Sequence, residues 1–449
     1  MNQKETTVER DLMGALKEWK DSTRRKPLVL EGVRQCGKTW LATEFGRTCF
    51  DKFAYVSLLD NPRMAALFEG GIAPDRLVPA LSIESGVAIS PHNTLIVLDE
   101  VQEVPRALTS LKYFCERAPE YPVLATGSSM GMTLHEGTSY PVGKVTIMRL
   151  FPLTFCEFLT AFGRRQLADA IREADLELLR VFHDELLEHL ALYLVLGGMP
   201  EVVSTAADSL PALDGPSLQE LQAAVNNAYR ADFSRHEREM PRGLPTRLNQ
   251  VWDSMPSQLA RENKRFLYGA VRSGARGRDF ELAIQWLQDM SLALKVPKAN
   301  PPQYPLAMNT SPDLFKLFLS DVGLLSQRAG VSMRSSLEQD ALFGMAKGAF
   351  AKQYVCQQLF ALGYQPRYWQ ADNSSAELDF VIQTDGEAIP IEVKSGINLR
   401  SKSLKAAVKR FGYVHAIRFS PAKGGVDGVI RDIPLYAVEA LPSLFARGA

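Results

Sequence analysis

L-V-L-E-G-V-R-Q-C-G-K-T, residues 28–39, is the stretch that decides the fold. It opens with an apolar run that ends at a glycine, and the following T-W-L-A-T-E-F, residues 39–45, is typical of a helix that Gly46 stops. Between them, residues 32–39 fit the pattern G-x-x-x-x-G-K-[ST]. Glycines at these places let backbone N–H groups turn inward around phosphate oxygens, and the helix adds its dipole and unpaired donors. The pattern therefore predicts a phosphate-binding loop between a strand and a helix.

The residues of this loop predict ATP and Mg²⁺ as the cofactors. We expect Lys38 to reach the β- and γ-phosphates, and Thr39 to hold magnesium through its hydroxyl. The expected nucleotide-binding residues are Gly32, Val33, Arg34, Gln35, Cys36, Gly37, Lys38, Thr39 and Trp40.

A second motif, T-L-I-V-L-D-E at 94–100, is an apolar strand that ends in two acids. A buried strand would deliver Asp99 to the sheet edge, near the magnesium held by Thr39. Glu100 is then placed to orient or deprotonate the attacking water. An acidic pair after a strand is by itself usually a solvated turn, so the motif gains meaning from its pairing with the loop.

A third polar element, T-G-S-S at 126–129, ends the next strand. Ser128 is the expected sensor of the γ-phosphate, and it completes a catalytic set with Lys38 and Glu100. The alternative is a serine that caps a helix N-terminus.

Length and composition limit the remaining possibilities. A chain of 449 residues suggests about three domains. Lys plus Arg and Asp plus Glu both number 51, so no basic field surrounds the whole protein. Neither a run of about 18 apolar residues nor a signal peptide is present, and the five scattered cysteines are typical of reduced thiols. We therefore expect a cytoplasmic protein with no membrane association.

Strand and helix patterns alternate in the first third of the chain, which indicates a parallel sheet covered on both faces. Leucines and a phenylalanine recur every fourth residue from Leu178 to Leu194, which predicts one amphipathic helix that stops at L-G-G-M-P, residues 196–200. Two helical segments and a strand-like run within 243–330 are compatible with a winged helix. The pattern returns to mixed α/β after about residue 336.

Several motifs together resemble the AAA-superfamily ATP-binding proteins of bacteria and archaea that carry a C-terminal domain of unknown function with a nuclease-like core. These motifs are GVRQCGKTWLA (32–42), VLDEVQ (97–102), TGSSMG (126–131), SYPVGKV (139–145), FPLTFCEFL (151–159), YLVLGGMPEVV (193–203), PSQLARENKRFLYG (256–269), FKLFLSDVGLL (315–325) and AELDFVIQ with IPIEVKSG (376–396).

The resemblance implies an α/β fold with four parts. These are an AAA-type P-loop ATPase core (1–160), a helical lid (161–240), a winged-helix-like domain (241–335) and a PD-(D/E)xK, restriction-endonuclease-like α/β domain (336–449).

Asp379, Glu392 and Lys394 fit the D…E-x-K arrangement of that nuclease superfamily. Neighbouring strands would place the two carboxylates side by side to bind magnesium, with Lys394 on the same face as Glu392. The sequence departs from the family at Lys352, where relatives often have a glutamate, and Glu377 is a candidate to compensate. A catalytic nuclease and a fold kept for binding without cleavage both stay open.

Two function classes follow. One is an ATPase coupled to DNA binding or remodelling, and the other is a nucleotide-controlled switch whose C-terminal domain binds a protein partner. Local cations in the middle of the chain favour DNA, although a solvated basic face has the same composition. They are Arg261, Lys264, Arg265, Arg272, Arg276 and Arg278. A homo-oligomer that completes the site with an arginine is also open, with Arg149, Arg230 and Arg235 as candidates.

Overall fold

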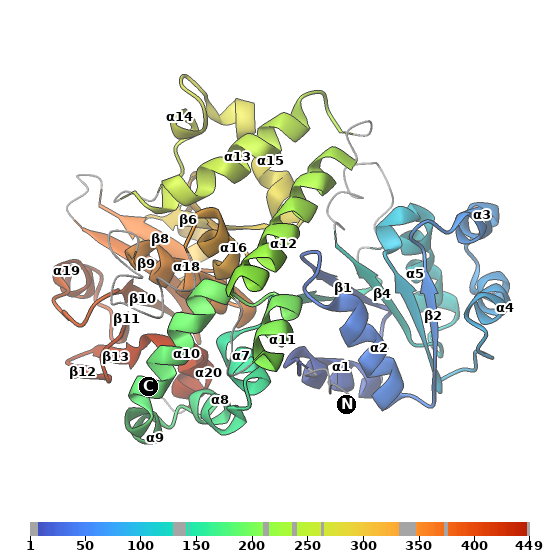
Figure 1. The fold of residues 1–449 in the computed structure, drawn as a ribbon, viewed down its shortest axis with the longest axis horizontal. Helices are drawn as coiled ribbons and strands as arrows, with labels where there is room; N and C mark the ends of the chain where they lie inside the picture. Colours follow the sequence, from blue (N-terminus) through green and yellow to red (C-terminus); the bar gives the residue numbers. More distant parts are fainter. Residues whose placement is uncertain are drawn as a thin grey trace. The chain divides into compact units, whose positions relative to one another are not determined.

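The structure, a computed structural model, describes residues 8–128, 141, 143–209, 215–235, 240–261, 265–331, 347–371 and 376–446. Two units account for the chain (Figure 1). The smaller unit comprises Arg10–Phe151 and Asp289–Ser291, and the larger one comprises Met1–Glu9, Pro152–Gln288 and Leu292–Ala449. The division into four domains therefore stays a prediction, and all three of its internal boundaries, at 160, 240 and 335, fall within the larger unit.

The smaller unit is built on a parallel sheet of five strands in the order β2-β3-β4-β1-β5. All four strand pairs run parallel, and β3 is buried at each of its six residues because both faces of the sheet are covered. The expected P-loop α/β fold is confirmed. The strands are β1 (Leu28–Gly32), β2 (Lys52–Ser57), β3 (Thr94–Asp99), β4 (Val123–Gly127) and β5 (Thr146–Leu150).

The helices of this unit connect the strands. They are α1 (Leu12–Asp21), α2 (Lys38–Cys49), α3 (Pro62–Gly70), α4 (Pro74–Ser85), the 3-10 turn η1 (Val101–Glu103) and α5 (Pro105–Arg117). The predicted end of α2 at Gly46 is wrong, because the helix continues to Cys49. A Cβ atom at Gly46 would lie 2.8 Å from the Cβ of Phe53, so the glycine is needed for close packing against β2.

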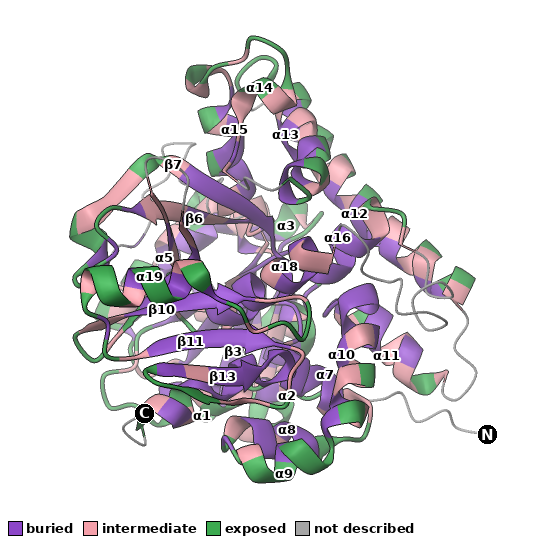
Figure 2. Cartoon of the chain, turned by 90° about the vertical axis from the view of Figure 1, so that its left-hand side faces the viewer, coloured by how far each residue is buried: buried purple, intermediate pink, exposed green. Residues whose placement is uncertain are grey.

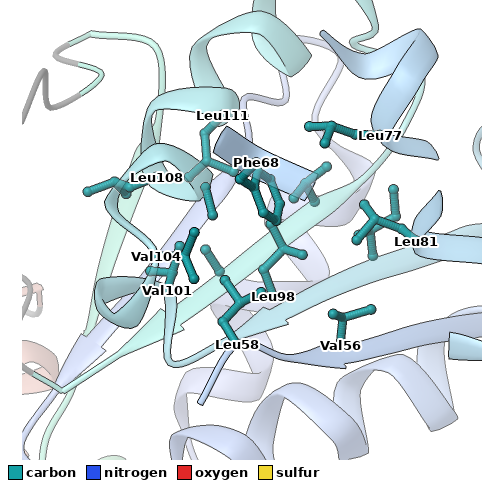
Figure 3. Close-up of a cluster of buried hydrophobic side chains, with 14 of the residues drawn as sticks. Val56, Leu58, Phe68, Leu77, Leu81, Leu98, Val101, Val104, Leu108 and Leu111 are labelled. Atoms are coloured by element: carbon teal, nitrogen blue, oxygen red, sulfur yellow. The ribbon is translucent and has the colours of Figure 1, made fainter. Parts of the chain in front are cut away.

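One hydrophobic core lies between the sheet and helices α3, α4 and α5 (Figure 3). Val56 and Leu98 come from the strands, and Phe68, Leu81 and Leu111 come from the three helices. Each buried side chain of this size contributes roughly 1.5–3 kcal/mol of hydrophobic free energy. The core also takes in Val101, the first residue of η1, and Val104, the residue that follows η1.

Helices make up the first part of the larger unit. The single helix predicted from Leu178 to Leu194 is wrong, because the backbone leaves the helical region at Phe182 (φ −98°, ψ 20°). Its helices and turns are α7 (Phe155–Ala161), α8 (Arg165–Arg172), α9 (Leu176–Val181), α10 (His183–Leu196), α11 (Pro200–Asp208), α12 (Gly215–Arg235), α13 (Leu244–Leu259), α14 (Tyr268–Val271), α15 (Gly277–Asp289), η2 (Leu306–Asn309), α16 (Val322–Arg328), α18 (Lys347–Ala361), α19 (Lys402–Phe411), η4 (Leu435–Ala440) and α20 (Leu441–Ala446). Across the described ranges, no helix combines the length and apolarity needed to cross a lipid bilayer.

A mixed sheet of eight strands in the order β12-β13-β11-β10-β9-β8-β6-β7 forms the rest of the larger unit. Its central strands β10 and β11 are largely buried, whereas α19 exposes one face (Figure 2). The β6–β7 ribbon, expected in a separate winged unit, joins this sheet through the pair Lys298–Tyr368. The strands are β6 (Ala293–Ala299), β7 (Thr310–Leu319), β8 (Arg367–Gln370), β9 (Glu377–Thr384), β10 (Glu387–Val393), β11 (Ala416–Ser420), β12 (Gly425–Asp427) and β13 (Ile430–Pro434).

A buried carboxylate joins the end of α10 to the start of α16. The predicted helix stop at Gly197 is confirmed, since this residue has φ 74°, and a Cβ atom there would lie 2.2 Å from Oδ1 of Asp321. Asp321 accepts hydrogen bonds from the backbone N–H groups of Gly198 (2.7 Å) and Leu324 (3.2 Å). Burial outweighs these bonds and raises the pKa of Asp321 to about 6.

Asp321→Asn tests this site, because the amide has the same shape and does not ionise. The raised pKa means that Asp321 stabilises the fold fully below its unfolded-state pKa, near 4, and that this contribution is lost as the pH rises through about 6. We expect the native chain to lose about 1–3 kcal/mol relative to the variant between about pH 4 and about pH 7. Thermal or urea unfolding at a series of pH values measures this, and a pH-independent difference would contradict it.

Candidate functional site

The P-loop connects β1 to α2 with the expected backbone geometry. Gln35 (φ 65°) and Gly37 (φ 91°) both adopt left-handed conformations, which turn the chain into the first turn of α2. The left-handed region is uncommon for a residue other than glycine, so Gln35 marks local backbone strain of the kind found at ligand sites. The helix that begins at Lys38 is 12 residues long, so it presents a full N-terminus with unpaired N–H donors.

Among the residues that the structure describes, the buried Lys38 ammonium has no carboxylate partner. Lys38 is only 6% exposed, and its Nζ donates to the backbone oxygens of Gly32 and Val33, each at 2.9 Å. Neutral carbonyls leave the charge of the ammonium uncompensated, and a buried charge is costly unless it is paired. An anionic ligand such as a phosphate group would supply the missing negative charge.

Asp99 and Thr39 meet across the sheet edge, as the sequence predicts. Thr39 Oγ1 donates to the Asp99 carboxylate, 3.1 Å from both oxygens. Tyr55 also donates to Oδ2 of Asp99 at 2.7 Å, and Thr126 donates to Oδ1. Carboxylate and hydroxyl oxygens are the ligands that Mg²⁺ prefers, so this donor set fits the ion.

Strand register explains why these side chains converge. Leu98 of β3 pairs with Ala125 of β4, so the next residues of the two strands, Asp99 and Thr126, lie side by side. Burial and the neighbouring Asp99 carboxylate raise the pKa of Tyr55, so its hydroxyl stays a donor. Tyr55 and Thr126 were not among the predicted site residues. Thr126 had a signal, since it precedes Ser128 by two residues in the same polar motif, whereas Tyr55 lies in an ordinary strand pattern.

Glu100 and Ser128 also lie together. Glu100 has a left-handed backbone (φ 54°, ψ 50°) directly after β3, and its Oε2 accepts a hydrogen bond from Ser128 Oγ at 3.3 Å. Gln102 Nε2 donates to the same oxygen. The three expected catalytic residues thus come from the ends of β3 and β4 and from the start of α2.

A buried arginine, Arg10, holds the backbone of the P-loop by a hydrogen bond. Arg10 donates from Nη1 to the Cys36 oxygen at 2.7 Å and from Nη2 to the Phe151 oxygen at 2.5 Å. Cys36 Sγ lies 3.5 Å from the Leu150 oxygen, so the loop is tied to the end of β5 as well. Arg10 lies far from the loop in sequence and in no recognisable motif, so sequence alone had no signal for it.

The parts of Trp40 and of the candidate arginines in nucleotide binding stay predictions. Trp40 is 39% exposed on α2, and its part in nucleotide binding stays a prediction. Among the candidate arginines, Arg149 lies 3.6 Å from Glu31, and Arg230 pairs with Asp253. Ser129 and the Arg235 side chain lie outside the described residues.

In the C-terminal part of the chain, each candidate carboxylate has a lysine of its own. Lys352 of α18 pairs with Asp379, Lys394 lies 2.6 Å from Glu392, and Lys316 of β7 pairs with Glu377. Strand pairing does bring Asp379 next to Glu392, because Ile391 faces Phe380 across β9 and β10. No cluster of three or more His, Cys, Asp or Glu side chains in the described part of the chain is arranged to hold a metal ion.

The lysines and carboxylates of this cluster stabilise one another's charged forms. Burial opposes ionisation of Asp379, yet the charges of Lys352 and Lys316 keep the pKa of Asp379 below its usual value. Burial likewise disfavours the Lys352 ammonium, but the Asp379 carboxylate raises the pKa of Lys352. Val393 N–H donates to Asp379 Oδ2 at 2.9 Å, which occupies the second oxygen. The nuclease role of Asp379, Glu392 and Lys394 therefore stays a prediction.

A basic surface gathers on α13 and on the segment from α14 to α15. Arg272, Arg276 and Arg278 are exposed, and none of them forms an ion pair within the described residues. The backbone N–H of Arg276 and the charges of Arg278, Arg272 and Arg247 lower the pKa of Asp279. Cations from α13, from α15 and from the segment between them thus all act on the Asp279 carboxylate. Of the other predicted cations, Arg261 is exposed, Arg265 is half-buried and Lys264 lies outside the described residues.

Three family models match the chain. Residues 24–159 match an AAA domain, residues 187–335 match a domain of unknown function (DUF8612), and residues 347–424 match another (DUF4143). The first match spans both nucleotide motifs and the parallel sheet, so it supports an AAA-superfamily nucleotide-binding ATPase domain there. The comparison with curated proteins found no match.

Solved structures resemble the chain only distantly. The ORC1 protein of Aeropyrum pernix, solved in complex with DNA, is 13% identical and aligns over 75% of this chain and 94% of its own length, with a TM-score of 0.30. The ORC2 protein of the same organism, in its ADP form, is 15% identical over 74% and 95%, with a TM-score of 0.33. A STAND-type signal transduction ATPase from Pyrococcus horikoshii is 12% identical over 79% and 45%, with a TM-score of 0.28. Similarity at this level transfers neither ligand nor activity.

Lys352→Ala tests the importance of the C-terminal pairs. The side chains of Lys352 and Asp379 are only 20% and 7% exposed, so the change leaves a buried carboxylate without its ammonium. We expect a loss of about 3 kcal/mol of unfolding free energy in urea. Lys405→Ala is the matched control, because it breaks a 2.8 Å pair with Asp427 whose side chains are 58% and 46% exposed, and we expect no measurable change. Equal effects of the two variants would contradict this interpretation.

Proposed function

We propose that this chain is a Mg²⁺-dependent ATPase whose nucleotide turnover is coupled to the binding or remodelling of DNA. The observation that carries the ATPase part is the buried Lys38 ammonium, whose partners are two neutral carbonyls. It lies at the N-terminus of α2, and the next residue of that helix, Thr39, contacts Asp99. The Lys38 ammonium, which is suited to a phosphate, thus lies next in sequence to Thr39, whose hydroxyl and the Asp99 carboxylate are suited to magnesium.

Each residue of the site has a separate task in hydrolysis. Lys38 and the N–H groups at the start of α2 would bind the phosphates, and magnesium bound by Thr39 and Asp99 would neutralise part of their charge. Glu100 would orient the attacking water and accept its proton. Ser128 would contact the γ-phosphate, and its hydrogen bond to Glu100 would link that contact to the base.

The nucleic-acid part of the proposal rests on the basic surface of α13 to α15. Arg272, Arg276 and Arg278 are exposed and lack carboxylate partners among the described residues, so they are available to phosphates. Lys/Arg contacts to the phosphate backbone supply most of the affinity of proteins that bind nucleic acid without reading its sequence. We infer that this helical segment acts as the winged-helix-like DNA-binding part of the chain.

The C-terminal domain is proposed to have a PD-(D/E)xK-like fold that binds without cutting. Support comes from the lysine–carboxylate cluster, in which ammonium groups neutralise Asp379, Glu392 and Glu377. A magnesium ion would have to displace Lys352 from Asp379, at the cost of an unpaired buried ammonium. Glu377, the candidate to compensate for Lys352, is itself held by Lys316.

Two variants test the ATPase. Lys38→Ala removes the buried cation, so we expect loss of ATP binding, whereas Glu100→Gln keeps the shape of the site and removes the base. We expect Glu100→Gln to bind ATP normally and to reduce kcat by about 100-fold or more. ATP binding is measured by equilibrium titration, and turnover by phosphate release with Mg²⁺. Normal hydrolysis by both variants would contradict the proposal.

Removal of the basic surface tests the DNA part. We expect Arg272→Ala, Arg276→Ala and Arg278→Ala combined to weaken duplex DNA binding at least about tenfold at low salt, and to make the salt dependence shallower by about one unit for each phosphate that the variant no longer binds. Fluorescence anisotropy over a range of salt concentrations, with and without ATP, measures both quantities. Lys17→Ala, Arg24→Ala and Lys112→Ala combined make the matched control, since they remove the same charge from exposed positions elsewhere.

Two outcomes of this experiment would count against the proposal. A native chain without DNA affinity, in ATP or without it, would favour the alternative of a nucleotide-controlled switch whose C-terminal domain binds a protein partner. Magnesium-dependent nicking of the DNA that disappears in Asp379→Ala would show that the C-terminal domain cleaves after all.

A further inference from the structure

Gln102 occupies a position beside the proposed catalytic base that no motif assigns to it. It lies in the middle of η1, the short turn that follows Glu100. Its Nε2 donates to Glu100 Oε2, the same oxygen that Ser128 contacts from β4. Two donors therefore converge on one oxygen of the carboxylate. No described residue donates a hydrogen bond to the other oxygen, Oε1.

The backbone around Gln102 is firmly anchored. Val101, the first residue of η1, and Val104, the residue after it, belong to the hydrophobic core of the sheet (Figure 3). The backbone N–H of Glu103 donates to the backbone oxygen of Glu100 at 3.0 Å and closes the turn. The left-handed backbone of Glu100 starts this turn directly after β3. Gln102 is thus held by packing that is independent of any ligand.

The amide of Gln102 has a second, unused group. Its Oε1 is buried and has no hydrogen-bond partner in the described part of the chain, although a buried acceptor without a partner costs about 1–3 kcal/mol. The orientation of the amide follows from chemistry, because exchanging Oε1 and Nε2 would place an acceptor against a carboxylate. A donor that entered the site would satisfy this oxygen.

We propose that Gln102 is a positioning residue for ATP hydrolysis, which holds Glu100 by Oε2 so that Oε1 faces the attacking water. The inference rests on the proposed ATPase function and adds one residue to it. A glutamate side chain otherwise samples several rotamers, and most of them turn both oxygens away from a bound water. Holding one oxygen with two donors removes that freedom before substrate arrives, which is the preorganisation that a general base requires. Gln102 acts through Glu100 and leaves the binding of ATP to the P-loop.

Gln102→Met tests the inference, because methionine has similar volume and cannot donate a hydrogen bond. With full-length protein, ATP and Mg²⁺, we expect kcat to fall by about tenfold, while KM and the dissociation constant for ATP change less than about twofold. Gln102→Ala is the second variant, for use if Gln102→Met lowers the yield of folded protein. Retained ATP binding shows in either case that the P-loop is intact.

A double-mutant cycle separates positioning from a general loss of structure. In a Glu100→Gln background there is no base left to position, so we expect Gln102→Met to change the residual kcat less than about twofold. An equal loss of kcat in both backgrounds, an unchanged kcat in the single variant, or a loss confined to ATP binding would each overturn the inference. Glu100→Gln alone reports separately on the proposed ATPase. A native chain without turnover would end both proposals, whereas a normal Glu100 effect with an inert Gln102 would end only this one.

Discussion

The parallel pairing of β3 with β4, and of β4 with β1, is the constraint on which the nucleotide site depends. Because the three strands run in the same direction, the residues that follow them emerge at one edge of the sheet. The buried run of β3 delivers Asp99 there, and β4 delivers Thr126 and Ser128 between it and the start of α2. A shift in the pairing would separate these side chains, however well each motif were preserved.

The two candidate sites use lysines and carboxylates in opposite ways. At the P-loop, the buried Lys38 ammonium has two neutral carbonyl partners and no carboxylate among the described residues, so the site is suited to an anion. In the C-terminal domain, each carboxylate already has a lysine, with Lys352 against Asp379 as the most buried pair. A site that lacks a counter-charge gains from an anionic ligand, whereas a site whose carboxylates already have lysines has to lose an internal pair before it binds a metal ion. This difference favours the smaller unit as the place of the chemistry.

Several tertiary contacts have no counterpart in local sequence. Asp321 accepts a hydrogen bond from Gly198, which lies more than a hundred residues earlier in the chain, and no periodic pattern connects the two. Gly46 resembles a helix terminator, yet it lies within α2 because Phe53 packs against it. The sequence pattern places the β6–β7 ribbon in a helical unit, but the ribbon extends the C-terminal sheet through its pairing with β8. Gly46 and the β6–β7 ribbon thus follow their packing partners and not the pattern of their own segments.

The sequence by itself determined the P-loop, the acidic strand end and the α/β order of the first third, because these depend on short-range spacing and on alternation along the chain. It also predicted the meeting of Thr39 with Asp99, since parallel strands leave little choice at their carboxyl ends. Only the tertiary structure decided that Tyr55, Arg10 and Gln102 support this site, and that Lys352 pairs with Asp379. Such contacts depend on register and on side-chain direction between segments far apart, and spacing along the chain carries no information about either.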